Sequence, residues 1–370
     1  MSRGLAALGH RVRIVCASTN QLGCSNRKAS AAEGARHLRI WECPEVPPTH
    51  AWDGQLVPTQ DLINFLLEEW RRKLKGDVLH AHDWHGLVAA CAVGAARTVP
   101  VVFTHHSAPT EYYPGLPAEK PKEAFLRKMA NVRLVTPIVV PSRVSRDELL
   151  KRGFREDDVV TIPWGMSAQF HQSKANQPGL ATRLRSRKPL VFCPTRHDPP
   201  HKDVETFVNA AHEVLQGWHA GTPPTFLIAT NRTTKTGALL WEKIAAMGMA
   251  GSFIVETLTR DEMPTAYREA DVTVIPSRRE SFGMVILEAF IYRTPVIAAA
   301  SGAIPEVVQH DVTGLLFTDG AYEELADRIV RLLTDPTHSK GLAARALAAV
   351  KGEFTRERMA RAHSQLYQRL

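Results

Sequence analysis

No apolar run in this sequence approaches the roughly 18 residues that a membrane-spanning helix needs. The first residues also lack the apolar core of a secretory signal peptide. The five cysteines are scattered and form no CxxC pair, which argues against a disulfide framework and a zinc site. They are Cys16, Cys24, Cys43, Cys91 and Cys193. Together these absences predict a protein of the reducing cytoplasm.

Motifs for nucleic-acid binding are missing as well, although the net charge is +8. No helix-turn-helix, zinc finger or aromatic RNA-binding platform is present, so nucleic acid is not an expected partner. Basic clusters at residues 71–75 and 183–188 could attract an anionic nucleotide or an anionic membrane surface. Considered separately, each basic cluster is more simply explained as a group of solvent-exposed side chains. Peripheral contact with the inner membrane surface therefore stays open.

The remaining composition is that of a globular protein, with 44% hydrophobic and 23% charged residues over 370 positions. This length predicts two domains. The most informative stretch is residues 271–317. There a short β-branched run at 272–276 predicts a buried strand, and a polar loop follows it. Gly283 then opens an apolar helix at 284–292. Unpaired N–H groups at such a helix start favour an anion such as phosphate.

Two carboxylates flank this turn, Glu280 on the loop and Glu288 inside the helix. At about 1.5 Å of rise per residue their spacing corresponds to about 12 Å. Paired carboxylates of glycoside hydrolases lie roughly 5 to 9.5 Å apart, so a hydrolase is disfavoured. Two carboxylates that accept hydrogen bonds from hydroxyl groups on either side of a diphosphate fit better. The plainer alternative is two solvated carboxylates, but the apolar surroundings of Glu288 weaken it.

A series of short motifs in and after this stretch resembles family 4 of the retaining glycosyltransferases. They are ESFG at residues 280–283, EA at 288–289, GAIPE at 302–306 and TGLLF at 313–317. The resemblance implies the GT-B fold, in which two Rossmann-like domains face each other. It covers nearly the whole chain and is stronger in the second half.

The expected domains follow from this resemblance and from composition. Residues 1–170, with a terminal helix at 355–370, are expected to form the acceptor domain. Residues 189–354 are expected to form the nucleotide-sugar donor domain. The polar, basic stretch 171–188 reads as the linker. The chain starts on what resembles the family's first helix and second strand, so the first strand of the N-domain is expected to be absent, through truncation or shortening.

Several strand ends carry candidate binding groups. Arg196 and Lys202 follow a strand directly before a helix, where positive charge can meet a diphosphate. On their own they could equally be two surface cations. Histidines gather after the strands near residues 79 and 104, at an edge where open α/β sheets bind ligands. A metal cluster built on these histidines is the less favoured alternative.

The resemblance assigns roles to these groups. It places Arg196 and Lys202 on the leaving diphosphate, Glu288 on the ribose hydroxyls, and Glu280 with His106 on the donor sugar. His105 is the alternative to His106 in register. Further contacts are implied for the helix start, comprising Ser281, Phe282, Gly283 and Met284, and for the nucleobase, comprising Glu256 and Leu258. Trp164 stands where the family usually has asparagine and is expected to reshape the wall of the cleft or to pack.

The expected function is a retaining, metal-independent sugar transfer from a nucleotide-diphosphate donor, with a UDP-sugar favoured. The acceptor would be a small molecule, a glycan or a lipid. No cofactor is expected beyond the nucleotide sugar as co-substrate, and no enzyme nucleophile is required. Two alternatives stay open. One is a nucleotide-sugar epimerase or phosphorylase. The other is a non-catalytic or degenerate nucleotide-sugar-binding protein, which the missing strand favours and the complete set of charged residues opposes.

Overall fold

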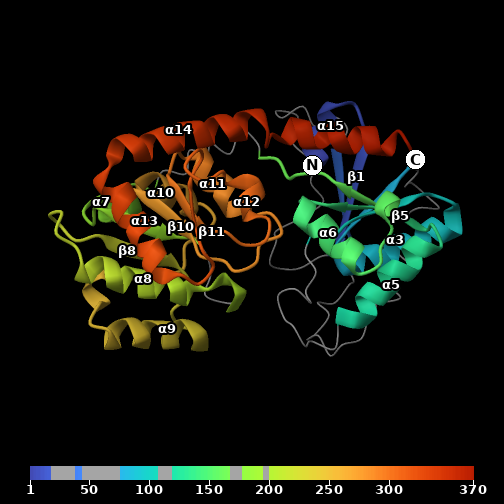
Figure 1. Ribbon diagram of the computed structural model, residues 1–370. Coiled ribbons are helices and arrows are strands. Elements are labelled where there is room, and N and C mark those ends of the chain that lie inside the picture. Colours follow the sequence, from blue (N-terminus) through green and yellow to red (C-terminus); the bar gives the residue numbers. More distant parts are fainter. Residues whose placement is uncertain (18–37, 44–75, 107–118, 167–176, 195–199) are drawn as a thin grey trace. The chain divides into compact units, whose positions relative to one another are not determined.

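The computed structural model describes residues 1–17, 38–43, 76–106, 119–166, 177–194 and 200–370 (Figure 1). It divides into two compact units, one formed by Met1–Gly165 with Arg356–Leu370 and the other by Met166–Thr355. The terminal helix thus belongs to the first unit, where the sequence placed it. Across these described ranges, every helix is too short or too polar to cross a membrane.

The first unit contains two parallel sheets. Its chain starts with a helix and a strand, as the sequence predicted, and β1 pairs with β2. Four further strands, β3 to β6, lie side by side in chain order. The strands are β1 (Val12–Ala17), β2 (Leu38–Cys43), β3 (Leu79–His82), β4 (Val101–Thr104), β5 (Val135–Val140) and β6 (Val159–Thr161). The helices are α1 (Ser2–Ala7), α3 (Asp83–Arg97), α5 (Glu119–Asn131), α6 (Arg143–Lys151), the 3-10 turn η2 (Glu156–Asp158) and α15 (Arg356–Tyr367).

Successive side chains of a strand point to opposite faces of the sheet, so the first unit has one apolar cluster on each face. Val101 and Phe103 of β4 join one apolar cluster with residues of α3, α5 and α6. Val102, between them, points to the other face and joins a cluster that includes Met359 and Leu366 of α15. A strand buried on both faces reads as a continuous apolar run, which is why residues 100–104 were recognisable in the sequence.

The second unit is built on one six-stranded parallel sheet with the order β12-β11-β10-β7-β8-β9. The strands are β7 (Leu190–Cys193), β8 (Thr225–Ala229), β9 (Phe253–Glu256), β10 (Val272–Ile275), β11 (Val296–Ala299) and β12 (Leu315–Phe317). The helices are α7 (Pro178–Arg185), α8 (Val204–Gln216), α9 (Lys235–Ala246), α10 (Met263–Glu269), α11 (Met284–Ile291), α12 (Ile304–Val307), α13 (Tyr322–Thr334) and α14 (Pro336–Gly352), with 3-10 turns η4 (Pro200–Lys202) and η5 (Ala250–Ser252). This is the doubly wound order of a dinucleotide-binding fold.

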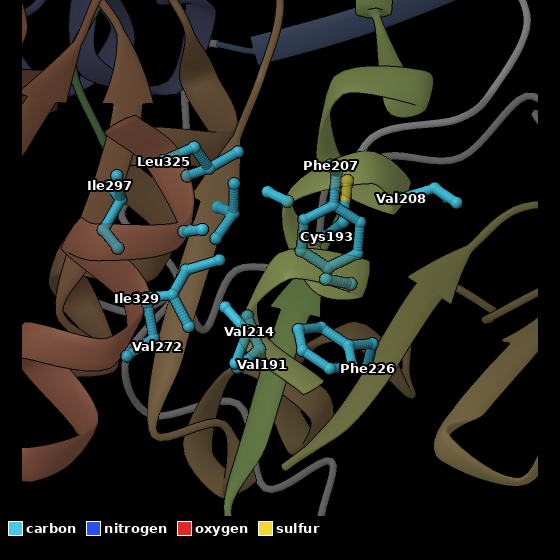
Figure 2. Close-up of a cluster of buried hydrophobic side chains, with 14 of the residues drawn as sticks. Val191, Cys193, Phe207, Val208, Val214, Phe226, Val272, Ile297, Leu325 and Ile329 are labelled. Carbon is cyan, nitrogen blue, oxygen red and sulfur yellow. The ribbon is translucent and has the colours of Figure 1, made fainter. Parts of the chain in front are cut away.

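Helices cover both faces of this sheet (Figure 1). On one face Val191 and Cys193 of β7 pack with Phe207 of α8 and Ile329 of α13 (Figure 2). On the other face Phe192 meets the ring of Tyr267 from α10. The most informative stretch of the sequence forms β10–α11–β11, and β10 and α11 each end one residue before their predicted bounds.

Some expectations differ from the structure. Residues 178–185 of the expected linker form helix α7, whose Leu180, Ala181 and Leu184 are buried within the second unit. Asp319 precedes α13 without capping it, since that helix begins after Ala321 and lacks a side-chain cap. Ser142 caps α6 by accepting a hydrogen bond from the N–H of Ser145, the role that serine commonly has before a helix. The apolar residues at helical spacing in 61–74 predict one further helix, and this stretch lies outside the described ranges.

Candidate active site

The candidate site lies where the strand order of the second sheet reverses. From the neighbouring strands β7 and β10 the chain proceeds to opposite edges of the sheet, through β8 and β9 on one side and β11 and β12 on the other. The loops that leave the carboxyl ends of two such strands diverge and open a crevice, where open α/β sheets bind ligands. The loop after β7 carries Lys202, and the loop after β10 carries Glu280.

Lys202 and Glu280 form an ion pair across this reversal point. The Nζ of Lys202 lies 2.5 Å from Oε1 of Glu280, and the two side chains are 25% and 12% exposed. The sequence assigned them to separate parts of a ligand, and the structure brings them into direct contact. An ammonium has three donors. Among the described residues the contact with Glu280 uses one of these donors, which leaves two for a bound anion.

Arg278 ties together the two loops that carry this pair. Its N–H donates to the carbonyl of His201 at 2.8 Å. Its Nε donates to Oδ2 of Asp203 at 2.8 Å. The same carboxylate oxygen accepts from the hydroxyl of Thr206 on α8. Because Arg278 bonds to the segment that contains Lys202, the position of Glu280 is fixed relative to Lys202.

The loop after β11 supports Glu280 from its other side. The N–H of Ala303 donates to the carbonyl of Glu280 at 2.9 Å. Gly302 has a positive φ of 54°, and a Cβ built on it would lie 2.6 Å from that carbonyl oxygen. Only a residue without a side chain permits this approach. Sequence motif GAIPE therefore positions the backbone of the first carboxylate.

Helix α11 begins directly after this loop. Gly283 precedes the helix in the left-handed conformation with φ of 87°. The side chain of Phe282 is 2% exposed and packs edge-on against Phe354. Phe282 can therefore offer a ligand only its backbone, while its ring anchors the turn. Ser281 and Met284 are half-buried, and the first N–H groups of α11 form a site suited to a phosphate.

Glu288 lies one turn further along α11 and is half-buried. Its Oε2 accepts a hydrogen bond of 2.9 Å from the hydroxyl of Tyr267. Burial raises the pKa of Glu288, whereas this hydrogen bond and the charge of Arg260 lower it. A carboxylate in an apolar helix thus has a specific partner, which the sequence did not identify.

The residues expected at the nucleobase lie at the end of β9. Glu256 is held by two hydrogen bonds from Arg183 of α7, at 2.6 and 3.0 Å. Leu258 follows on the loop and is half-buried. Both residues lie at the carboxyl edge of the same sheet as Lys202. Arg196, the other cation expected at the diphosphate, lies outside the described residues.

In the first unit, histidines gather at the carboxyl ends of β3 and β4. His105 is 6% exposed and meets the ring edge of Phe103, whereas His106 is exposed. Of these two candidates, only His106 is accessible to a ligand. Nδ1 of His82 lies 3.1 Å from Nε2 of His106, and the ring of Trp164 lies beside His106 with centroids 5.4 Å apart. Within the described ranges, groups of three or more side chains placed to hold a metal are not found.

Three histidines at these strand ends, His80, His82 and His105, predict that the protein loses stability in acid. Burial lowers the pKa of His82 and His105 to about 4, and that of His80 well below its usual value. Between about pH 6.5 and about pH 4 the unfolded chain binds protons that the folded chain does not, so acidification favours unfolding. We expect the urea midpoint to fall between about pH 7.5 and about pH 5.5. His105→Gln should make this dependence shallower, and an unchanged midpoint in the wild type would contradict the prediction.

Two family models match the chain. One, described as Glycosyltransferase Family 4, matches residues 1–170, and one described as Glycosyl transferases group 1 matches residues 188–335. A D-inositol 3-phosphate glycosyltransferase of Frankia alni is 25% identical over 367 residues, which are 95% of this chain and 88% of that protein. The lipopolysaccharide core biosynthesis mannosyltransferase LpcC of Rhizobium leguminosarum bv. viciae is 30% identical over 208 residues, 55% of this chain and 57% of that protein.

Solved structures show the same fold. Sucrose-phosphate synthase from Thermosynechococcus elongatus superimposes with a TM-score of 0.79 at 21% identity, covering all of this chain and 91% of that one. Anabaena HepE in complex with UDP-glucose gives a TM-score of 0.72 at 20% identity, over 91% and 87% of the two chains. The two family matches show that the chain belongs to glycosyltransferase family 4, and the structural neighbours together with the two parallel-sheet units show that it has the GT-B fold.

Proposed function

We propose that this glycosyltransferase moves a sugar from a nucleotide-diphosphate donor, a UDP-sugar, to a hydroxyl group of a small-molecule, glycan or lipid acceptor, with retention of configuration. The observation that carries the proposal is the Lys202–Glu280 pair at the reversal point of the second sheet, next to the start of α11. The choice of uracil is supported by the fold relative HepE, solved with UDP and with UDP-glucose.

In this proposal the leaving diphosphate is stabilised by fixed positive charge. As the bond between the anomeric carbon and the diphosphate oxygen breaks, negative charge develops on that oxygen. The ammonium of Lys202 and the N–H groups at the start of α11 would stabilise it electrostatically, together with Arg196. With these positively charged side chains and N–H groups in place, the step would require no metal ion.

The two carboxylates would hold the two ends of the donor. Glu280 would accept hydrogen bonds from hydroxyls of the transferred sugar, and Glu288 from hydroxyls of the ribose. His106, exposed at the end of β4, would be a further contact of the transferred sugar. The new bond would form on the face from which the diphosphate leaves. The acceptor's proton would pass to the departing phosphate oxygen, so no enzyme nucleophile takes part.

The experiment that tests this proposal is thermal unfolding with UDP, GDP, ADP or TDP. We expect UDP at about 100 times its Kd to stabilise the wild type by about 2.7 kcal/mol, a shift of several degrees, and the other nucleotides to act less. Glu288→Gln should lose most of this shift, because the amide replaces two acceptor oxygens by one. Lys243→Met, which removes a lysine paired with Glu205 on the surface of the same unit, should keep it.

Product analysis separates the remaining alternatives. A transferase yields a glycoside and free UDP, with the anomeric configuration of the donor. An epimerase returns an altered nucleotide sugar instead. Binding of UDP without any product would favour the non-catalytic alternative, and the absence of a shift with every nucleotide would contradict the proposed donor site.

A further inference from the structure

Glu288 and Tyr267 form a hydrogen-bonded pair beside the proposed donor site. Tyr267 lies on α10 and is 1% exposed. Its hydroxyl donates to Oε2 of Glu288 at 2.9 Å. Among the described residues, Tyr267 is the one side chain that donates a hydrogen bond to Glu288. The second carboxylate oxygen, Oε1, can therefore still accept hydrogen bonds from a ligand. Carboxylates accept through both oxygens, and a donor on one of them fixes the direction of the other.

The ring of Tyr267 is itself held on several sides. It meets Phe192 of β7 edge-on with centroids 5.2 Å apart, and stacks on Tyr292 at 5.8 Å. Its carbonyl accepts a hydrogen bond of 2.6 Å from the hydroxyl of Thr294. A tyrosine packed in this way has no free rotamer, so its hydroxyl is aimed permanently at α11.

We propose that Tyr267 is a positioning residue, which holds Glu288 as an ionised acceptor with one carboxylate oxygen turned towards the ribose hydroxyls of the nucleotide. The proposal rests on the proposed function, since it assumes that a nucleotide occupies this site. Tyr267 would touch no part of the ligand and would act only through Glu288.

The charges around Glu288 give this role a measurable consequence. Burial raises the pKa of Glu288, and the Tyr267 hydrogen bond and the charge of Arg260 lower it. The other titratable neighbours of the pair are Tyr292, Cys193 of β7, which acts electrostatically on Tyr267, and Arg268, whose guanidinium lies 5.0 Å from the Tyr292 ring. Tyr267→Phe keeps the packing and removes the donor, so the pKa of Glu288 should rise. A protonated carboxyl is a poorer acceptor, and nucleotide affinity should then begin to fall at a higher pH.

Calorimetric titration with UDP, the nucleotide that the proposed function favours, at about pH 7.5 and about pH 5.5 tests the inference. When the pH is lowered from about 7.5 to about 5.5, we expect Kd to rise about tenfold more in Tyr267→Phe than in the wild type. A tenfold change in Kd corresponds to the contribution of one charge-assisted hydrogen bond. Glu288→Gln should bind weakly at both values, and adding Tyr267→Phe to it should change nothing further. Titration of the UDP phosphate itself is common to all variants. Tyr322→Phe, which removes a hydroxyl on α13 of the same unit, should match the wild type.

Two results would overturn the inference. One is an equal weakening of affinity by Tyr267→Phe at both pH values, and the other is a persistent effect in the Glu288→Gln background. Either would reduce Tyr267 to a packing residue. The carboxyl carbon signal of Glu288, followed by NMR without ligand, decides the same question independently of the nucleotide. It should titrate at higher pH in Tyr267→Phe. If that shift is present while the wild type binds no nucleotide, the proposed function fails, and only the hydrogen bond by which Tyr267 favours the ionised form of Glu288 stands.

Discussion

Replacing Lys202 by methionine is expected to lower kcat/KM for sugar transfer by about 10²–10³. Methionine keeps most of the side chain's length and removes its charge. The leaving diphosphate would then lose a stabilising ammonium. Glu280, whose side chain is 12% exposed, would also lose the partner that lies 2.5 Å away. A carboxylate that is nearly buried and unpaired is costly and tends to reorient.

Steady-state kinetics with a UDP-sugar would measure this effect, and the split between its parameters locates it. A cation that acts on the developing charge affects kcat, whereas one that only holds the donor affects KM. We expect the larger part in kcat. Lys243→Met is the matched control, because its lysine is paired at 3.0 Å with the exposed Glu205 and lies on α9. Equal activity in Lys202→Met and Lys243→Met would show that the Lys202–Glu280 pair is structural only.

Much of the fold could be predicted because this chain has strong local patterns. The parallel strands of the second unit are buried on both faces, so β8, β10 and β11 appear as short apolar runs. Helix α14 was missed, although it spans 17 residues. It is rich in alanine and carries a glycine within it, so its buried face stands out little in the sequence. Helix α7 was taken for linker because its basic residues suggested solvent.

The structure shows why those basic residues lie on an ordered helix. Arg183 bonds to Glu256, and Arg185 bonds to Glu269. These partners are 73 and 84 residues away in the chain. A local sequence pattern cannot predict such pairs, because each charged residue alone is indistinguishable from an ordinary surface residue. The same is true of Tyr267, which precedes Glu288 by 21 residues on another helix. Pairing across elements depends on the tertiary fold, whereas the motifs around Glu280 are contiguous and can be read directly.

Gly302→Ala is expected to lower the free energy of unfolding by about 2–5 kcal/mol and to abolish most of the transfer activity. The backbone of Gly302 has a φ of 54°, a conformation that costs an alanine about 1–2 kcal/mol. The new methyl group would also lie 2.6 Å from the carbonyl oxygen and 2.9 Å from the nitrogen of Glu280. Overlap with backbone atoms of a packed loop adds about 1–3 kcal/mol. The loop would have to move, and Glu280 with it.

The activity loss distinguishes this mechanism from simple destabilisation. Because Glu280 is displaced while Glu288 stays on α11, the variant should still be stabilised by UDP at a temperature where it is folded, yet transfer sugar at least about 10² times more slowly. Gly251→Ala is the control, since that glycine has no atom within 4 Å of an added Cβ and no positive φ. Normal kcat in folded Gly302→Ala would contradict the idea that this close approach positions Glu280. Loss of UDP stabilisation together with activity would instead mean that the Glu280 loop and the nucleotide site move as one body.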